Sequence, residues 1–337
     1  MFARSRRLVF DCSALRFALP GSLSLLAKMA SMSMSPFGPP FGRLLTAMVT
    51  PFAGDGSLDL DAAAGLASYL VDELGNDGLV ISGTTGESPT TADTEKADLL
   101  RVVLDAVGDR ATVLAGVGTF NTEHTLELAA TAAKLGANGL LVVTPYYSKP
   151  PQAGILEHFR RVADATDTPV MLYDIPGRTS VAIATDTMLR LAEHPRIVAV
   201  KDAKGDLTAS ARVIAQSGLS YYSGDDAMTL PLLSVGAVGV VGTSTHFSAV
   251  GTKQMIEAYL AGEVAMALAL HQQLLPIYTG IFATQGCILV KAGLKLQGRD
   301  VGGLRSPLIE ATPAEVDSLR SALAAAGLQT GEVVSTD

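Results

Sequence analysis

The sequence has 337 residues, 48% of them hydrophobic, which is enough to bury the core of one large domain or of two average ones. Its 33 acidic and 25 basic side chains give a formal net charge of -8, which argues against nucleic acid or an anionic membrane surface as a partner. Its two cysteines, Cys12 and Cys287, have no CxxC companion, and its five histidines show no metal-ligand spacing. We therefore expect a small-molecule partner, no disulfide framework, no metal site and a cytoplasmic location.

The first 42 residues differ in character from the rest. Arginines precede a partly apolar stretch that superficially looks like a secretory or twin-arginine leader, but charged residues and Pro20 interrupt it. Met29, Met32 and Met34 offer later translation starts. We interpret residues 1–42 as a disordered or mis-started extension. No later segment is an unbroken apolar stretch of about 20 residues, so no membrane span is expected.

From Leu44 onward, short β-branched apolar runs alternate with longer amphipathic stretches, which is typical of repeated βα units around a parallel sheet. The eight predicted strands are Leu45–Val49, Gly78–Ser82, Thr112–Val117, Gly139–Thr144, Val170–Tyr173, Ile197–Lys201, Ser220–Ser223 and Gly239–Thr243. Predicted helices between them include Asp61–Leu74, Thr94–Val107, Thr122–Leu135, Ala153–Ala165 and Leu207–Gln216. The pattern predicts an α/β fold, a (β/α)8 TIM barrel over residues 43–248.

A doubly wound open sheet is the structural alternative. A dinucleotide-binding sheet would carry GxGxxG after its first strand, whereas here Thr50-Pro51-Phe52 follows. After the eighth strand, further helices are predicted over Lys253–Leu260, Glu263–Tyr278, Gly286–Leu296 and Pro313–Ala325. Because barrel closure does not need them, we treat residues 249–337 as a C-terminal helical appendage that packs on the barrel or on a neighbouring subunit.

In such barrels the active site lies at the carboxyl ends of the strands. The second strand runs into Ser82–Ser88, where glycines allow close approach of a ligand and consecutive N–H groups can hold a carboxylate. The fourth runs into Thr144–Pro151, a rigid loop that presents two phenols, and the fifth ends at Tyr173 with Arg178 beyond it. Taken singly, these segments are more typical of a tight capped turn, a packing or interface loop and a solvated arginine, respectively.

Lys201 ends the apolar run of the sixth strand, which would place it inside the mouth of the barrel. Loss of water there should lower its pKa from the reference value near ~10.4 and yield a nucleophilic amine. The alternatives are a lysine that extends to solvent or one that pairs with Asp202. Lys204 is a weaker candidate because it follows the strand. The loop Ser223–Asp226 after the seventh strand reads as a turn with a helix cap.

The ordered motifs GTTGES, TPYY, YDIPGR, VKDAKGD and YYSGDD, taken together, resemble the dihydrodipicolinate synthase family, and its actinobacterial members most closely. The resemblance runs from about Leu44 to the C-terminal helices. It implies the condensation of pyruvate with L-aspartate 4-semialdehyde in lysine biosynthesis through diaminopimelate, by a lyase that works as a homotetramer, a dimer of dimers, without a cofactor.

The resemblance also implies a role for each matching residue. Lys201 corresponds to the Schiff-base lysine, and Thr84, Tyr147 and Tyr173 correspond to a proton relay in which Tyr147 comes from an adjoining subunit. Positions that match substrate contacts are Thr85 with the backbone at Gly83 for the pyruvate carboxylate, Arg178 for the carboxylate of the semialdehyde, and Gly224 and Val241 in the pocket wall.

The sequence departs from lysine-inhibited members of the family at the positions that match their regulatory site. These are Asp93, Lys96, Phe120 and His124, while Ser88 and Tyr146 are retained. We therefore expect weak or absent feedback by lysine.

Two rival functions are another pyruvate-dependent class I aldolase, of the N-acetylneuraminate lyase or keto-deoxy-sugar aldolase type, and a non-catalytic barrel that binds a keto acid. The IPGR-type Arg178 discriminates against the first, and retention of the four relay and Schiff-base residues speaks against the second.

Overall fold

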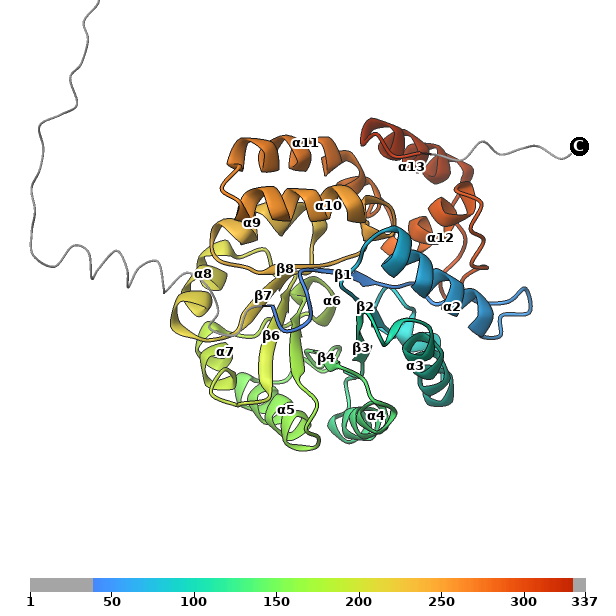
Figure 1. The fold of residues 1–337 in the computed structure, drawn as a ribbon. Coiled ribbons are helices and arrows are strands. Elements are labelled where there is room, and N and C mark those ends of the chain that lie inside the picture. The colour runs from blue at the N-terminus through green and yellow to red at the C-terminus, as the bar shows by residue number, and fades with distance from the viewer. Residues whose placement is uncertain (1–38, 330–337) are drawn as a thin grey trace, which may run out of the picture. The chain divides into compact units, whose positions relative to one another are not determined.

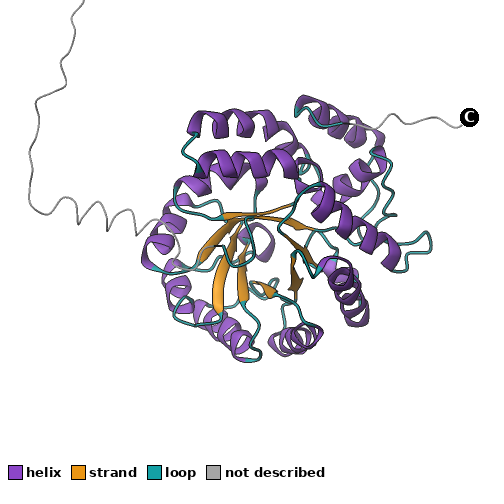
Figure 2. Ribbon diagram, viewed as in Figure 1, coloured by secondary structure: helices purple, strands orange, loops and turns teal. Residues whose placement is uncertain are grey.

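The computed structural model describes residues 39–329, which all belong to one compact unit. Eight parallel strands pair in chain order, and β1 closes the ring by pairing with β8, so that the sheet forms a closed barrel inside a ring of helices (Figures 1 and 2). The predicted TIM barrel is confirmed. The strands are β1 (Leu44–Ala47), β2 (Gly78–Ile81), β3 (Thr112–Gly116), β4 (Gly139–Val143), β5 (Val170–Asp174), β6 (Ile197–Asp202), β7 (Ser220–Ser223) and β8 (Gly239–Gly242).

Alternation along each strand separates two buried faces, as expected for a sheet covered on both sides. One face fills the barrel interior with Leu45, Ala47, Val80, Leu114, Leu141, Met171, Tyr173, Ala199, Tyr222 and Val241. The other face packs against the helices. Because neighbouring strands are in register from Tyr173 to Lys201 and on to Tyr222, side chains from β5, β6 and β7 meet at one level of the barrel.

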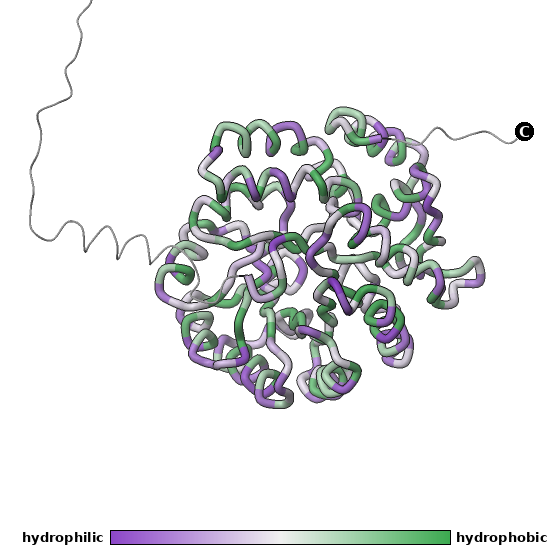
Figure 3. Tube along the Cα trace, viewed as in Figure 1, coloured by the Kyte–Doolittle hydropathy of each residue, from purple (hydrophilic) through white to green (hydrophobic). Residues whose placement is uncertain are grey.

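The helices of the barrel and the C-terminal region follow the sequence closely. They are α2 (Leu60–Ser68), α3 (Asp93–Val107), α4 (Thr122–Leu135), α5 (Gln152–Asp164), α6 (Pro176–Thr179), α7 (Thr185–Leu191), α8 (Leu207–Gln216), α9 (Thr229–Ser234), α10 (Thr245–Leu260), α11 (Val264–Gly280), α12 (Gly286–Leu296) and α13 (Pro313–Ala325). The backbone continues from α2 into a π-helical turn, Tyr69–Glu73, within what the pattern predicts as one helix. Figure 3 shows polar and apolar stretches alternating along the outer helices, as amphipathic helices require.

Four helical stretches are not evident from the sequence. α6, α7 and α9 are short, and α9 contains Pro231, a residue that disfavours helix interiors. The first turns of α10 contain Thr245, His246 and Ser248, which have modest helix propensity, but all three are fully buried. Tertiary packing therefore starts α10 eight residues before the predicted position.

Both ends of the barrel domain are marked by packing. Phe41 is buried in the barrel interior, its N–H donates to the Tyr222 hydroxyl at 3.3 Å, and its carbonyl accepts from Thr112 Oγ1 at 2.8 Å. We propose that the barrel begins by Phe41; positions 1–38 of the expected extension lie outside the described residues. At the other end, α10 contacts β1, and α11 packs on the outside of α10 (Figure 1), so we propose that the C-terminal appendage begins after α10 and not at residue 249.

Within residues 39–329, none of the helices combines the length and the apolar character that a membrane crossing requires.

Candidate active site

Lys201 lies inside the mouth of the barrel, as the sequence predicts. Its residue surface is 5% exposed, and its Nζ lies 4.5 Å from the centroid of the Tyr173 ring on the neighbouring strand. Asp202 points the other way, where it accepts hydrogen bonds from the Ser210 hydroxyl and from the Lys204 N–H. Neither a lysine extending to solvent nor a Lys201–Asp202 pair is therefore observed.

Burial gives the Lys201 amine its reactivity. Loss of hydration lowers its pKa to about 8; the carboxylate of Asp226 opposes this shift, and the guanidinium of Arg178 adds to it. At pH 7 a pKa of about 8 leaves roughly a tenth of the amine unprotonated, several hundred times more than at an ordinary lysine. The site therefore holds a nucleophile that can attack a carbonyl carbon.

Tyr173 connects the lysine with the loop that follows β2. The side chain of Thr84 acts on the Tyr173 hydroxyl closely enough to lower the pKa of the phenol, and the Tyr173 ring faces the Lys201 amine. Burial raises the pKa of Tyr173 to about 12, although Arg178 and Thr84 act in the opposite direction. The phenol therefore stays protonated at neutral pH and can pass a proton between the amine side and Thr84.

The residues expected to hold a keto-acid carboxylate lie next to this pair. Thr85 is buried, and its hydroxyl lies 3.3 Å from the hydroxyl of Thr243 after β8. Gly83 opens the same loop at the cavity surface. The structure thus brings the second and eighth strand ends together.

Gly224 and Val241 form part of the surroundings of Lys201. A Cβ built on Gly224 would lie 3.0 Å from Lys201 Cγ, so a side chain there would displace the stem of the lysine. Val241 is fully buried in β8, in the same interior cluster as Tyr173. Gly224 therefore restricts the stem of the lysine by shape, and Val241 belongs to the apolar interior that surrounds Tyr173.

A cavity of about 360 Å³ opens above these residues, within the roughly 300–1,000 Å³ common for small-molecule sites. Its lining includes Gly83, Thr84, Tyr173 and Arg178. Lys201, Thr85 and Val241 are buried beside the cavity and are not among its lining residues. Because Tyr173 both lines the cavity and contacts the lysine, the amine is one side chain away from the space that a substrate would fill.

The single chain does not bring Tyr147 into this site. Tyr147 is 92% exposed, and its backbone has the left-handed φ of 70°, which is uncommon for a bulky residue. Its neighbour Tyr146 lines the cavity and stacks edge-to-face on Phe120, with ring centroids 5.6 Å apart. Of the expected relay, Thr84 and Tyr173 therefore meet within one chain, and Tyr147 points away.

Sequence reasoning missed the role of Asp226, whose negative charge raises the pKa of Lys201 against the effect of burial. This carboxylate is fully buried and accepts hydrogen bonds from the N–H of Thr243, the N–H of Ser244 and the Ser244 hydroxyl at 2.6 Å. The motif GDD pointed only to a loop and a cap, and Asp225 does cap the next turn. The sequence carries no signal that separates the exposed Asp225 from the buried Asp226.

His246 is a second buried polar group near the strand ends. Its Nδ1 lies 2.8 Å from the Thr243 carbonyl, and its Nε2 accepts from the Val49 N–H at 3.3 Å. Burial lowers its pKa to about 4, so the ring is neutral with its proton on Nδ1. It fixes the turn that carries Thr243 and does not act as a base.

The fold is that of the (β/α)8-barrel enzymes, and comparison with known proteins identifies the branch. The sequence model of the Dihydrodipicolinate synthetase family matches residues 40–326, and the chain belongs to that family. It is 69% identical over 288 residues to the 4-hydroxy-tetrahydrodipicolinate synthase of Acidothermus cellulolyticus, covering 86% of this chain and 93% of that protein. The second such synthase of Streptomyces coelicolor is 60% identical, with 86% and 97% covered.

Solved structures give the same result. The dihydrodipicolinate synthase of Cyanidioschyzon merolae, determined with lysine bound, superposes with a TM-score of 0.84 at 43% identity, covering 86% of this chain and 99% of that one.

Proposed function

We propose that this protein is a lyase that condenses pyruvate with L-aspartate 4-semialdehyde, the reaction of 4-hydroxy-tetrahydrodipicolinate synthase, in lysine biosynthesis through diaminopimelate. The names of relatives that are 53–69% identical support this assignment. The structural observation that carries it is the Lys201 amine, buried against Tyr173 at the carboxyl end of β6 and beside a cavity that Arg178 lines.

The geometry supports a stepwise mechanism. The neutral Lys201 amine attacks the ketone carbon of pyruvate, and loss of water gives a protonated imine. This iminium withdraws electrons, so a methyl proton leaves and an enamine forms, whose carbon attacks the aldehyde of the second substrate. Cyclisation of the product then frees Lys201. Because the iminium is itself the electron sink, we expect no cofactor.

Tyr173 and Thr84 are the proposed carriers of protons in these steps. The Tyr173 ring lies 4.5 Å from the amine and its hydroxyl interacts with Thr84, so we assign to this hydroxyl the delivery of a proton to the departing water and the acceptance of one from the methyl group. Thr85, with the Gly83 backbone, would hold the carboxylate of pyruvate.

We further propose that Tyr147 completes the relay in a neighbouring subunit of a homotetramer, a dimer of dimers. An aromatic side chain that is 92% exposed on a left-handed backbone fits a residue made for a partner. The cytoplasm is the proposed compartment, because two cysteines without CxxC spacing suit a reducing environment.

The decisive assay supplies pyruvate and L-aspartate 4-semialdehyde and couples product formation to a reductase. Steady turnover supports the assignment. A keto-deoxy-sugar or N-acetylneuraminate lyase would instead cleave its own sugar acid and leave the semialdehyde unused. Sodium borohydride with pyruvate separates both from a non-catalytic barrel, because only an enzyme that forms the imine gains covalent mass at Lys201.

Arg178→Ala should weaken use of the semialdehyde much more than use of pyruvate. Loss of a charge-assisted pair with a carboxylate, worth roughly 1.5–3 kcal/mol, corresponds to a KM increase of about 10- to 100-fold. Steady-state kinetics with each substrate varied in turn measures this split, and Arg178→Lys should fall between wild type and Arg178→Ala. An equal rise in both KM values would contradict the role.

We also propose that lysine does not inhibit this protein at sub-millimolar concentration. At the positions that match the family's regulatory site, Lys96 places its own ammonium 2.5 Å from the Thr91 carbonyl and 3.9 Å from Asp93, and His124 pairs with Asp93 at 2.8 Å. A bound lysine would bring a second ammonium towards these already partnered groups. Titration of the coupled assay with L-lysine tests this, with L-norleucine, whose side chain is uncharged, as the control; inhibition by lysine alone in that range would refute it.

A further inference from the structure

One wall of the cavity comes from the segment Gly302–Leu308, which joins α12 to α13 and lies far from the strand ends in sequence. Pro307 and Leu308 line the cavity together with Thr84 and Arg178. They are apolar and line the same cavity as Arg178. The family motifs named above do not include these residues, and they give no indication of which contacts hold this wall in place.

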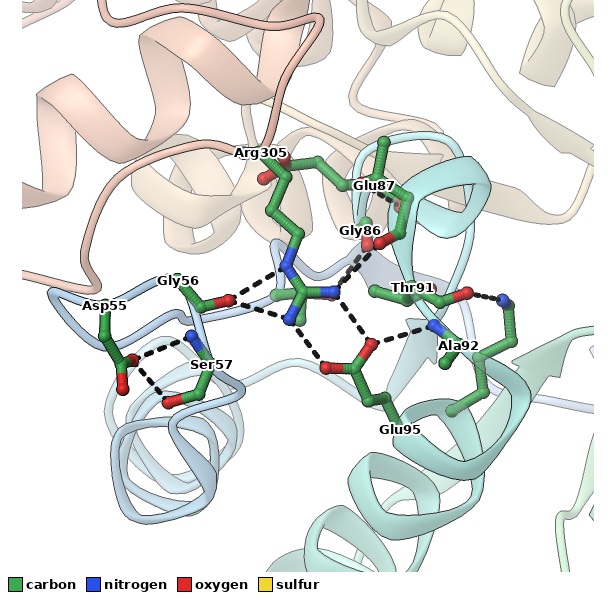
Figure 4. A network of polar contacts seen from close by, with 12 residues as sticks. Asp55, Gly56, Ser57, Gly86, Glu87, Thr91, Ala92, Glu95 and Arg305 are labelled. Carbon is green, nitrogen blue, oxygen red and sulfur yellow. Dashed lines mark hydrogen bonds and ion pairs between the residues drawn. The ribbon is translucent and has the colours of Figure 1, made fainter.

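Arg305 anchors this segment to two other parts of the barrel mouth (Figure 4). Its guanidinium makes two hydrogen bonds to the Gly56 carbonyl at 3.0 and 2.8 Å and one to the Thr90 carbonyl at 2.8 Å. A bidentate pair with Glu95, at 2.7 and 2.6 Å, uses its remaining two N–H groups. All five guanidinium donors are therefore engaged, which only the planar fork of arginine allows.

A second connection joins the same segment to the loop that carries Thr84. The Arg305 backbone N–H donates to Glu87 Oε2 at 3.0 Å, and the Glu87 N–H in turn donates to the Thr84 carbonyl at 3.2 Å. Glu87 also forms a buried ion pair with Lys291 of α12, at 2.8 Å. The C-terminal segment and the Thr84 loop thus share one carboxylate.

Phe52, which follows β1, contacts both cations of this network. Lys291 Nζ and Arg305 Cζ each lie 4.3 Å from the centroid of its ring. The ring attracts both positive groups through its π-electrons. The Arg305 guanidinium is therefore held both by the Phe52 ring and by the hydrogen bonds of its N–H groups.

We propose that Arg305 is a positioning residue for the second substrate: it holds Pro307 and Leu308 as the wall that confines the aldehyde against Arg178. This inference rests on the proposed condensation. Pyruvate reacts deeper in the barrel, at Lys201, which β5 and β6 hold without help from the C-terminal segment. Displacement of the wall should therefore affect capture of the aldehyde and leave formation of the imine unchanged.

Arg305→Lys is the sharpest test, because it keeps the charge and removes the fork. A shift of about 1 Å in a positioning group costs on the order of 10²-fold, and partial displacement should therefore raise the KM for the semialdehyde about 10-fold, with borohydride trapping of pyruvate within about twofold of wild type. Glu95→Gln, which retains shape and weakens the same pair, should move the same KM in the same direction by less. Leu308→Ala should reproduce the effect with the anchor intact.

The matched control is Arg110→Lys. Arg110 makes a bidentate pair with Asp72, at 2.7 and 2.8 Å, but it precedes β3 at the opposite end of the barrel. This variant should leave both KM values and the trapping rate unchanged. It shows whether an effect of Arg305→Lys comes from the place of Arg305 beside the cavity or merely from the loss of a bidentate ion pair.

The readouts separate failure of this inference from failure of the proposed function. If wild type traps no pyruvate, the condensation itself is wrong. If wild type traps pyruvate and condenses it, but Arg305→Lys and Leu308→Ala leave the KM for the semialdehyde unchanged, the positioning role is overturned. It is also overturned if Arg305→Lys slows trapping and condensation equally, since that pattern indicates general loss of structure. A selective rise in the KM for the aldehyde supports it.

Discussion

Lys201→Ala is expected to abolish both the borohydride-trapped pyruvate adduct and turnover, lowering kcat by roughly 10⁴-fold or more, as loss of a covalent nucleophile does. The reason is that no other group at the site can form an imine: Tyr173 and Thr84 offer only hydroxyls, and Arg178 is permanently protonated. Intact-mass spectrometry after borohydride treatment and the coupled assay measure the two effects on the same sample.

Lys204→Ala is the matched control for this experiment. Lys204 is three residues further along the chain, but its amine lies 3.6 Å from Asp174 Oδ2, on the outer side of the strand ends. It should therefore retain the adduct and most of the turnover. Full adduct formation in Lys201→Ala, or loss of the adduct only in Lys204→Ala, would show that Lys201 is not the lysine that forms the imine.

The parts of the site that lie at strand ends could be predicted because the physics there is local. The apolar run that ends at Lys201 and the parallel pattern of the sheet together determine that this side chain faces the interior, as the structure shows with Tyr173 beside it. The strand positions followed from the same reasoning and are correct to within about two residues of each end, the uncertainty usual for element boundaries.

The rest could not be predicted because it depends on contacts between distant segments. Arg305 contacts Gly56 and Glu95, more than 200 residues away in sequence, and no periodicity marks such a contact. Asp226 looks like an ordinary loop residue until α10 delivers the Ser244 hydroxyl to it. The start of α10 was misplaced for the same reason, since burial and not propensity decides it.

The buried pair of Glu87 and Lys291 leads to the prediction with the largest effect on stability. Their side chains are 0% and 4% exposed and lie 2.8 Å apart, so Lys291→Met would leave a carboxylate in the interior without its counter-ion. Such a loss typically costs about 3–5 kcal/mol of unfolding free energy, whereas replacing both partners by neutral groups is often close to neutral. The double variant Glu87→Gln with Lys291→Met should therefore recover most of the stability that the single variant loses.

The chain offers a control with the same substitution and the same distance. Lys253 and Asp77 also lie 2.8 Å apart, but their side chains are 37% and 29% exposed. Water solvates these charges when the pair is broken, so Lys253→Met should cost about 1 kcal/mol or less. Urea unfolding followed by circular dichroism gives all four values. Equal losses of unfolding free energy in Lys291→Met and Lys253→Met would contradict this prediction, and so would a double variant that is no more stable than Lys291→Met. Either result would show that the burial of an unpaired charge does not determine the stability of this network.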